Sequence, residues 1–551
     1  MKRLLLSLFF LTMLLSTTAQ ASTQFADVPA NSWAINAIEN AVNNGLMSGT
    51  GDGNFGYGNH ISRAEYVALL NNMFNWNAAN PSSPTFTDVT PGQWYYTHIE
   101  SAAANHIISP MDWHLFNPTE PILRQDMAVM LVRALGYSSL AQLVVEFEPM
   151  PFTDVSNYKG YIIVAHDIGL ISGVGGGLFA PYNTATREQA AAMITHIYSR
   201  LNAPLHWIHG FYAFASFHQR DLIRDMHAIS FGWSQMEWNE ETGARLNTTA
   251  QNNNPWVIPS GYELIANFPR ENNATTNLSV FMDTTMGLDN LIASESSRRQ
   301  AIDAILQEAT RIYEAIGRSP FDGVTINFEG LRGETAKNNF SAFLVALEYR
   351  LRAANLSLYV TVHPQTIDGI YFDGYDIRLI GELADRVILM AHDYHPRSMD
   401  GFIGTHWHRN AAITPIAEVY RALKAITHPT TGVSDHSKIA IAFNFANIGW
   451  FVDEQEMLAA ISPVAVAPEV VITRKRQTDT RHGWSETFRN PYMVYTTEDG
   501  ERVFLWFEND RSVEEKLNLA RLFGITGASV WRIGIVPNEF DWDVWGAFTR
   551  R

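Results

Sequence analysis

The sequence predicts an α/β protein: a (β/α)8 barrel of the TIM type that follows a smaller, mainly helical region. One observation behind this prediction is a helical pattern that occurs three times before residue 202. The other is a series of eight apolar, strand-like runs, separated by amphipathic stretches, in the last ~345 residues. A hairpin signal between the seventh and eighth runs predicts an insertion in the barrel.

The eight runs expected to form the barrel strands are rich in β-branched and aromatic residues. They cover residues 209–214, 228–234, 264–268, 323–329, 358–364, 387–394, 439–445 and 528–534. The hairpin signal consists of residues 492–495 and 503–507 around Glu-Asp-Gly at 498–500. We therefore expect one barrel domain over residues 205–551.

The helical region is built from one motif. Phe-x-Asp-Val occurs at residues 25–28, 86–89 and 152–155, and each copy leads to a helix that starts at Arg63, Arg124 or Arg187. Apolar side chains then recur at i, i+3, i+4, i+7 and i+8, which indicates one buried helical face. Capping pairs, Ser62 with Glu65 and Thr186 with Gln189, place the arginine in the first turn, where the helix dipole disfavours a cation.

The composition indicates an exported, globular protein. Lys2 and Arg3 precede an apolar run over residues 4–15, and small residues follow at 19 and 21, which predicts a signal peptide over residues 1–21. That run is too short to span a bilayer, so membrane insertion is not expected. The chain has no cysteine, which excludes thiol catalysis. Its net charge of −17 argues against nucleic acid as a partner, because phosphate binding needs a basic surface.

The most informative run is Phe-Asp-Gly-Val-Thr-Ile-Asn-Phe-Glu at residues 321–329. Alternate residues of a strand share a face, so Thr325, Asn327 and Glu329 lie on one side. In a barrel that side is the lumen, and active sites are built at the carboxyl ends of the strands. Glu329 is therefore a candidate catalytic acid; the alternative is a surface acid at a strand end.

This run resembles the D-G-x-D-x-D-x-E signature of glycoside hydrolase family 18, especially its peptidoglycan-directed spore-glycosidase branch. Asp322, Gly323 and Glu329 match the signature, whereas Thr325 and Asn327 each replace an aspartate. Three further stretches resemble the family. Residues 390–393 (Met-Ala-His-Asp) resemble its M-x-Y-D motif after the sixth strand, residues 503–517 resemble its seventh-strand region, and residues 530–534 (Val-Trp-Arg-Ile-Gly) resemble its last strand.

The family resemblance implies a β-N-acetylglucosaminidase or chitinase-like hydrolase that works by substrate-assisted retention without a cofactor. Glu329 would protonate the leaving oxygen, with Asn327 and Asp393 completing the catalytic group. The substrate-binding residues implied are Asp322, Thr325, Met390, His392 and Trp531. Trp484 and Trp506, beside the hairpin, either stack on sugar rings or only pack the insertion.

A metal site is the alternative for the histidines that follow the sixth run. His392, Asp393, His395, His406 and His408 lie close together in sequence. Their spacing matches no compact ligand signature, so we expect no metal.

The three repeats resemble S-layer homology repeats, which we place at residues 22–82, 83–148 and 149–201. The resemblance implies a pseudo-threefold helical bundle that binds a secondary cell-wall polymer or peptidoglycan through Arg63, Arg124 and Arg187. A guanidinium suits the carboxylate or phosphate groups of such polymers. The alternative is that each arginine pairs with an acid of its own repeat. Leu123 departs from the pattern, since it replaces the capping hydroxyl of the second repeat.

Together these resemblances predict a secreted protein, held at the cell surface or wall, that hydrolyses an N-acetylglucosamine polymer such as peptidoglycan or a chitin-like glycan. The alternative from another class is a non-catalytic, wall-anchored lectin or envelope structural protein. Asn327 separates the two, because it carries no charge where the family has an aspartate.

Overall fold

The structure is a computed structural model that describes residues 25–365, 372–539 and 542–550. The expected signal peptide lies outside the described residues. By its internal contacts the chain divides into two compact units, Met1–Leu135 with Ala180–Tyr198 (unit 1) and Gly136–Phe179 with Ser199–Arg551 (unit 2). The first half of the expected third repeat, up to Phe179, therefore belongs to unit 2.

Unit 1 is helical, and the segments that lead into its second helices pair with one another. His60 bridges Thr186, Ser62 bridges Pro121, and Leu123 bridges Thr184, so each repeat contacts both others as a pseudo-threefold arrangement requires. Its helices are α1 (Ile35–Asn43), α2 (Arg63–Phe74), α3 (Tyr96–Ala104), α4 (Arg124–Ala134) and most of α7 (Arg187–Leu201).

The second helices start where the sequence predicts, each at its arginine. Ser62 and Glu65 form the complete capping box. In α7 only half of the box is present: the Thr186 backbone N–H donates to the Gln189 side chain, while the Thr186 hydroxyl has no partner within the described residues.

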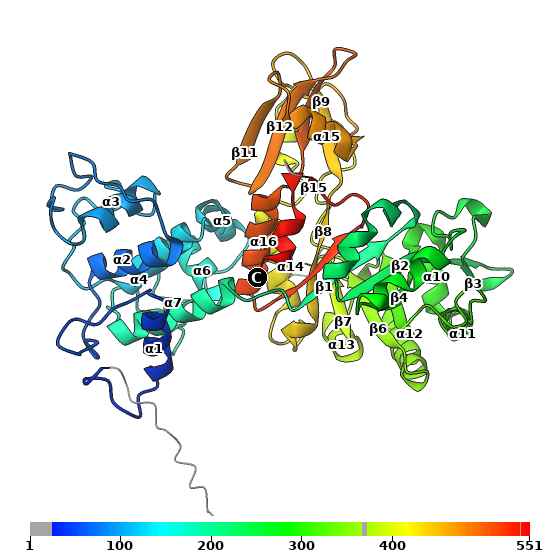
Figure 1. Cartoon of the computed structure of the whole chain (residues 1–551), viewed down its shortest axis with the longest axis horizontal. Coiled ribbons are helices and arrows are strands. Elements are labelled where there is room, and N and C mark those ends of the chain that lie inside the picture. The colour runs from blue at the N-terminus through cyan, green and yellow to red at the C-terminus, as the bar shows by residue number, and fades with distance from the viewer. Residues whose placement is uncertain (1–24, 366–371, 540–541, 551) are drawn as a thin grey trace, which may run out of the picture. The chain divides into compact units, whose positions relative to one another are not determined.

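Unit 2 contains a closed barrel of eight parallel strands with helices outside it (Figure 1), which confirms the predicted fold class. Closure comes from β1, which pairs with both β14 and β2. In order around the barrel the strands are β1 (Trp207–Tyr212), β2 (Ala228–Asn239), β4 (Thr275–Asp283), β5 (Gly323–Glu329), β6 (Ser357–Val362), β7 (Arg386–Leu389), β8 (Ile439–Asn444) and β14 (Gly527–Trp531).

The third expected strand is wrong. Residues 264–268 form α8 (Glu263–Ala266) and the start of α9 (Phe268–Glu271), and the third barrel strand is β4. Pro269 lies in the first turn of α9, where proline is tolerated, whereas it removes a hydrogen bond from a central strand. β4 carries buried polar residues on its lumen face, so it lacks the apolar run that marked the other strands.

The helices of unit 2 bury one apolar face each; in α14 that face includes Val419, Tyr420 and Leu423. Those of the barrel are α10 (Leu288–Ala293), α11 (Glu295–Ala309), α12 (Gly333–Ala353), α13 (Ile377–Leu383), α14 (Ile416–Ile426), α16 (Asp510–Leu522) and α17 (Trp545–Thr549). The segment before the barrel forms α5 (Ser138–Leu143) and α6 (Lys159–Asp167). Among the helices of the described residues, none combines the length and apolar character needed to cross a bilayer.

The predicted hairpin is part of a larger insertion between β8 and β14. Its strands β12 and β13 pair antiparallel, within a five-stranded sheet of order β10-β9-β13-β12-β11 (Figure 1). These strands are β9 (Asn447–Val452), β10 (Val464–Val466), β11 (Arg481–Ser485), β12 (Asn490–Thr496) and β13 (Arg502–Trp506), with α15 (Pro468–Lys475) before β11.

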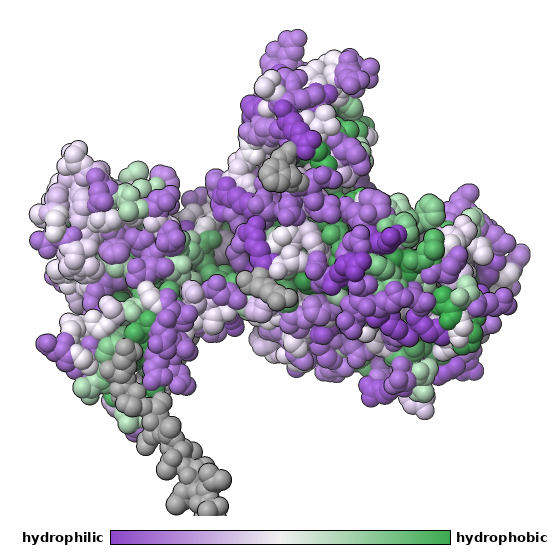
Figure 2. Space-filling model, in the orientation of Figure 1, coloured by the Kyte–Doolittle hydropathy of each residue, from purple (hydrophilic) through white to green (hydrophobic). Residues whose placement is uncertain are grey.

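Trp506 packs the insertion, one of the two roles expected for it. Its side chain is buried in the core of the inserted sheet with Trp450 and Phe504, and its indole N–H donates to the His408 carbonyl at 3.0 Å. The ring of Trp484 instead contacts two guanidinium groups, that of Arg489 at 5.5 Å and that of Arg511 at 3.8 Å from the ring centroid. On the face shown in Figure 2, hydrophilic residues cover most of the surface, with hydrophobic patches between them.

Candidate active site

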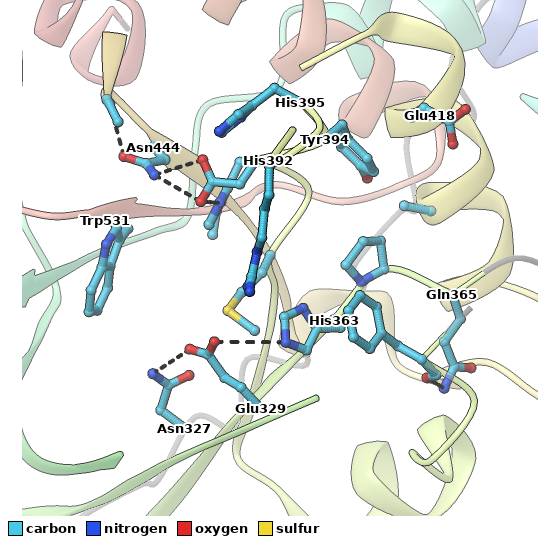
Figure 3. A pocket seen from close by; sticks show the side chains of 18 of the residues that line it. Asn327, Glu329, His363, Gln365, His392, Tyr394, His395, Glu418, Asn444 and Trp531 are labelled. Atoms are coloured by element: carbon cyan, nitrogen blue, oxygen red, sulfur yellow. Dashed lines mark hydrogen bonds and ion pairs between the residues drawn. The ribbon is translucent and has the colours of Figure 1, made fainter. Parts of the chain in front are cut away.

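A cavity of about 1020 Å³ opens at the carboxyl ends of the barrel strands. Its lining includes Glu329 from the end of β5, His363 just after β6, Asn444 from the end of β8 and Trp531 from the end of β14 (Figure 3). Parallel strands end at one rim of a barrel, which is why residues far apart in sequence converge here.

Glu329 is the acid at the centre of this cavity. Its side chain is 31% exposed, and its Oε2 lies 3.8 Å from Nε2 of His363. Burial raises the pKa of Glu329 above its ordinary value, against the opposing effect of a hydrogen bond from Asn327 and the charge of His392; Asp283 and Asp393 raise it further. Burial lowers the pKa of His363 to about 4, so this histidine is neutral at neutral pH.

Asn327 bridges Glu329 to the next strand. Its amide Nδ2 donates to Glu329 Oε1 at 3.0 Å, and its Oδ1 accepts from the Thr361 hydroxyl at 2.6 Å. The side chain is buried, and β5 brings it to the same face as Glu329, as the alternation of the sequence predicts. The hydrogen bond to Glu329 favours the ionised carboxylate, so Asn327 and burial act on the acid in opposite directions.

His392 and Asp393 form a second polar group on the cavity wall. His392 Nδ1 lies 2.9 Å from Asp393 Oδ2, and Asn444 Nδ2 donates to both Asp393 oxygens at 2.9 Å. Desolvation opposes ionisation of Asp393, but His392 and Asn444 outweigh it and lower the pKa of Asp393 to about 2. Asp393 has a φ of 61°, a conformation that costs ~1–3 kcal/mol unless its surroundings hold it. The two hydrogen bonds from Asn444 stabilise Asp393 in this conformation.

Aromatic rings form a further part of the cavity wall. Trp531 lies 5.0 Å from Phe211 and 5.5 Å from Trp256, measured between ring centroids, and all three line the cavity. Met390 also lines it. An indole face of this kind is a surface on which the apolar face of a sugar ring can stack.

The structure thus brings together six of the expected catalytic and substrate-binding residues: Glu329, Asn327, Asp393, Met390, His392 and Trp531.

Two expected substrate-binding residues lie outside the cavity. Asp322 precedes β5 at the amino end of the barrel, ~20 Å of strand from Glu329. Its carboxylate pairs with Arg270 and accepts from the Thr276 backbone N–H at 3.0 Å. Thr325 is fully buried in the lumen, where its hydroxyl lies 2.7 Å from that of Ser230. Both residues therefore support the barrel rather than face a ligand in this cavity.

Among the lining residues that the sequence analysis missed, His363 and Asn444 had a signal in the sequence and Trp256 had none. His363 continues the alternation of Tyr359 and Thr361 beyond β6, and Asn444 ends the alternation of β8, so each could be placed on the lumen face. Trp256 comes from an irregular segment after β3 (Gly243–Asn247), where no periodicity indicates its direction.

The histidines weighed as metal ligands are dispersed. His408 is fully buried beneath the inserted sheet, against the ring of Phe504, and His406 contacts the carbonyl of Gln455. Within the described residues, no three His, Asp or Glu side chains are grouped as a metal site requires.

In unit 1, two of the three repeat arginines are buried in ion pairs with another repeat. Arg63 pairs with Asp126, and Arg187 pairs with Glu65. Each also donates through Nε to the carbonyl of a neighbouring repeat, Phe116 at 2.6 Å or Phe55 at 2.9 Å. The pairing joins repeats, whereas the alternative expected from the sequence was a pair within one repeat. Arg124 is partly exposed at the start of α4.

Comparison with known proteins follows the same division of the chain. The model of the glycosyl hydrolases family 18 matches residues 195–535, more than half of the chain. The chain belongs to this family. The S-layer homology domain model matches three times, over residues 24–67, 85–128 and 151–191, so the chain joins three S-layer homology repeats to a family 18 domain.

Relatives at the level of sequence are distant. The chain is 28% identical over 248 residues to the cortical fragment-lytic enzyme of Bacillus anthracis. The aligned region covers 44% of this chain and 53% of that enzyme. It is 28% identical over 181 residues to an S-layer protein of Bacillus thuringiensis subsp. finitimus, 32% of this chain and 22% of that protein. The chain spans about half the length of the first of these relatives.

Among solved structures, the C-terminal domain of a chitinase candidate from Desulfitobacterium hafniense aligns with a TM-score of 0.50 and 19% identity. The alignment covers 63% of this chain and 99% of that domain. At this identity the likeness supports the family 18 barrel fold alone.

Proposed function

We propose that this family 18 protein is a wall-anchored glycosidase that hydrolyses β-linked N-acetylglucosamine polymers, of the peptidoglycan or chitin-like type, by substrate-assisted retention. The observation that carries the proposal is Glu329: a half-buried carboxyl with a raised pKa, opening on a cavity that has Trp531 on its wall. The relationship to cortical fragment-lytic enzymes supports it.

In the first step, the sugar lies on Trp531 and the carbonyl oxygen of its own acetamide attacks C1. The bond from C1 to the leaving oxygen breaks, and Glu329 gives its proton to that oxygen. A raised pKa keeps Glu329 protonated for this step.

In the second step, water attacks C1 of the oxazolinium intermediate while the ionised Glu329 accepts its proton. The acetamide reopens, the product keeps its anomeric configuration, and Glu329 is protonated again. The amide N–H that Asn327 donates to Glu329 stabilises the carboxylate present between the two steps.

The acetamide group would be held by Asn327 and His392. Asn327 Oδ1 accepts one hydrogen bond, from Thr361, and retains a lone pair for the acetamide N–H. His392 Nε2 is buried, has no partner within the described residues and belongs to the cavity lining, so it can bond the same group. Asp393 fixes the ring of His392 from its other nitrogen.

One observation favours a second candidate function, that of a non-catalytic, wall-anchored lectin or envelope structural protein. Asn327 lacks the charge with which an aspartate would stabilise the oxazolinium. Such a loss costs a factor of ~10²–10³ in rate when a single stabilising group is removed, so turnover is slowed rather than abolished. We therefore favour the glycosidase.

The three repeats are proposed to hold the secreted protein at the cell surface through a secondary cell-wall polymer or peptidoglycan. Arg63, Arg124 and Arg187 are the candidate contacts. For Arg63 and Arg187, a polymer carboxylate would have to displace Asp126 or Glu65 from an existing ion pair.

The deciding experiment incubates the mature protein with purified peptidoglycan and with N-acetylated chitohexaose, and identifies the products by mass spectrometry. We expect new reducing ends on N-acetylglucosamine, absent with the Glu329→Gln variant and with chitosan oligomers that lack the acetyl group. Glu334→Gln, a change at an exposed carboxyl of α12, is the matched control and should keep full activity. Binding without any product from wild type would establish the lectin instead.

A further inference from the structure

The cavity continues well beyond Glu329. In Figure 3, Trp531 and Asn444 lie on one side of Glu329, and Gln365 and Glu418 lie on the other. A volume of about 1020 Å³ is at the upper end of the ~300–1,000 Å³ typical of small-molecule sites. There is room for groups on the sugar next to the one that stacks on Trp531.

Two arginines also line the cavity. Arg421, on α14, has a side chain that is 26% exposed, and its guanidinium stacks over the ring of Phe147 at 5.0 Å. Its Nη1 is 3.5 Å from Glu418 Oε2, too long for a tight ion pair. Arg397, after β7, is exposed, and within the described part of the chain it has no ion pair or hydrogen bond.

The position of Arg421 is fixed by the packing of its helix. One turn along α14, Lys424 Nζ forms ion pairs of 2.6 Å with Glu148 and with Asp167, and the Tyr420 hydroxyl donates to Asp167. These contacts join α14 to the segment that contains α6, while Arg421 and Glu418 face the cavity. The guanidinium is therefore carried by a helix whose position is fixed by these ion pairs, rather than by a flexible loop.

The charges along the cavity are divided. Asp393 is engaged by His392 and Asn444, and Glu329 by Asn327, on the side near Trp531. Apart from these groups, the described lining adds two arginines, Arg397 and Arg421, and one carboxylate, Glu418, so this part of the described lining is net positive in a chain whose net charge is −17.

We propose that Arg397 and Arg421 form a subsite for a carboxylate carried by the substrate glycan, next to the sugar that stacks on Trp531. A guanidinium binds a carboxylate with two parallel hydrogen bonds, and a neutral chitin-like polymer offers no such group. This inference rests on the proposed function and deepens it. It makes a peptidoglycan-type polymer the preferred substrate, with the carboxylate on the lactyl ether of its muramic acid or on its stem peptide.

The test compares three tetrasaccharide probes: neutral chitotetraose, a peptidoglycan fragment stripped of peptide so that its lactyl carboxylates are free, and the same fragment with intact stem peptides. Binding is measured by calorimetry on the Glu329→Gln protein, so the result does not depend on turnover, and kcat/KM is measured on the active protein. Arg421→Ala, Arg397→Ala and the double variant are compared with Arg299→Ala, an exposed arginine of α11.

We expect each cavity arginine to contribute about tenfold to the affinity and kcat/KM for carboxylate-bearing probes, in line with hydrogen bonds to charged groups. The change on chitotetraose should stay below about twofold. Arg421→Ala could also lower the affinity by perturbing the helix. Arg421→Lys is therefore included: it keeps a positive charge on a long side chain and should recover part of the loss. A loss confined to the stripped fragment identifies the lactyl group, and a loss confined to the intact one identifies the stem peptide.

Equal losses on neutral and charged probes, or tighter binding of chitotetraose by the parent protein, would overturn the subsite. If the glycosidase itself fails, no probe is cleaved by any variant, yet the binding ratios still decide the role of the arginines. The two proposals can therefore fail separately.

Discussion

The repeats and the barrel use their charged motif residues in different ways. In unit 1, Arg63 and Arg187 are nearly buried and joined to carboxylates of other repeats. In unit 2, Glu329 has an amide and a neutral histidine beside it, and it remains 31% exposed to the cavity. A motif identifies which charge matters, but the partners around that charge decide whether it stabilises the fold or remains available to a ligand.

The largest effect that this comparison predicts is on Glu329. Glu329→Gln should lower kcat on N-acetylglucosamine polymers at least ~10³-fold, because general acid–base catalysis at this position is lost. Its thermal midpoint should not fall, since removing a half-buried carboxyl relieves desolvation. Steady-state kinetics and a melting curve measure both. A marked drop in stability would mean that Glu329 is a structural charge like the arginines.

Arg63→Ala should produce the next largest effect, and on stability. The change leaves Asp126 buried without its cation, which costs ~3 kcal/mol. Hydrogen exchange of the α2 and α4 amides should accelerate by ~10²-fold, while kcat on a soluble oligomer stays unchanged. Arg299→Ala, which breaks an exposed pair with Glu295, should cost under ~0.5 kcal/mol. Unchanged exchange together with lost wall binding would place Arg63 at the polymer instead.

Asn327→Asp should give a smaller effect, in the direction of gain. A carboxylate at this position would stabilise the oxazolinium and raise kcat about 10²-fold. The pH profile carries a second signature. Activity falls as pH rises through the pKa of Glu329, which burial already raises, and a second carboxylate 3.0 Å away raises it further.

The basic limb of the plot of kcat/KM against pH should therefore move to higher pH in Asn327→Asp. It should also move to higher pH in Asn327→Ala, but by a smaller amount, because that change only removes the hydrogen bond to the carboxylate. A limb that stays in place in both variants would show that a group other than Glu329 controls it.

The sequence predicted the barrel and most of its site because both follow from period-two alternation. That rule placed Asn327 and Glu329 together at the carboxyl end of β5. It failed for β4, because buried Asn277 and Ser279 interrupt the apolar signal of a strand whose lumen face is polar. Alternation alone does not place Asp322, but its position before the first residue of β5 does, because the cavity lies at the opposite end of that strand.

The first strands of the inserted sheet and the partners of the arginines could not be predicted from the sequence, for a different reason. β9 begins three residues after β8 ends, so the two strands read as one apolar stretch. The ion pairs of Arg63 and Arg187 join positions 63 and 122 residues apart. Only the assembled bundle determines which carboxylate each guanidinium meets.

The division of the chain into two units bears on how the protein could be released from its proposed attachment to a cell wall. The backbone passes between the units three times, after Leu135, after Phe179 and after Tyr198. A single proteolytic nick at any of these crossings leaves at least one unit divided between the two fragments, which non-covalent packing within that unit still holds together. Shedding of the barrel would therefore require unfolding of a unit as well as cleavage, so the proposed wall attachment should resist proteases that would free a domain on a simple tether.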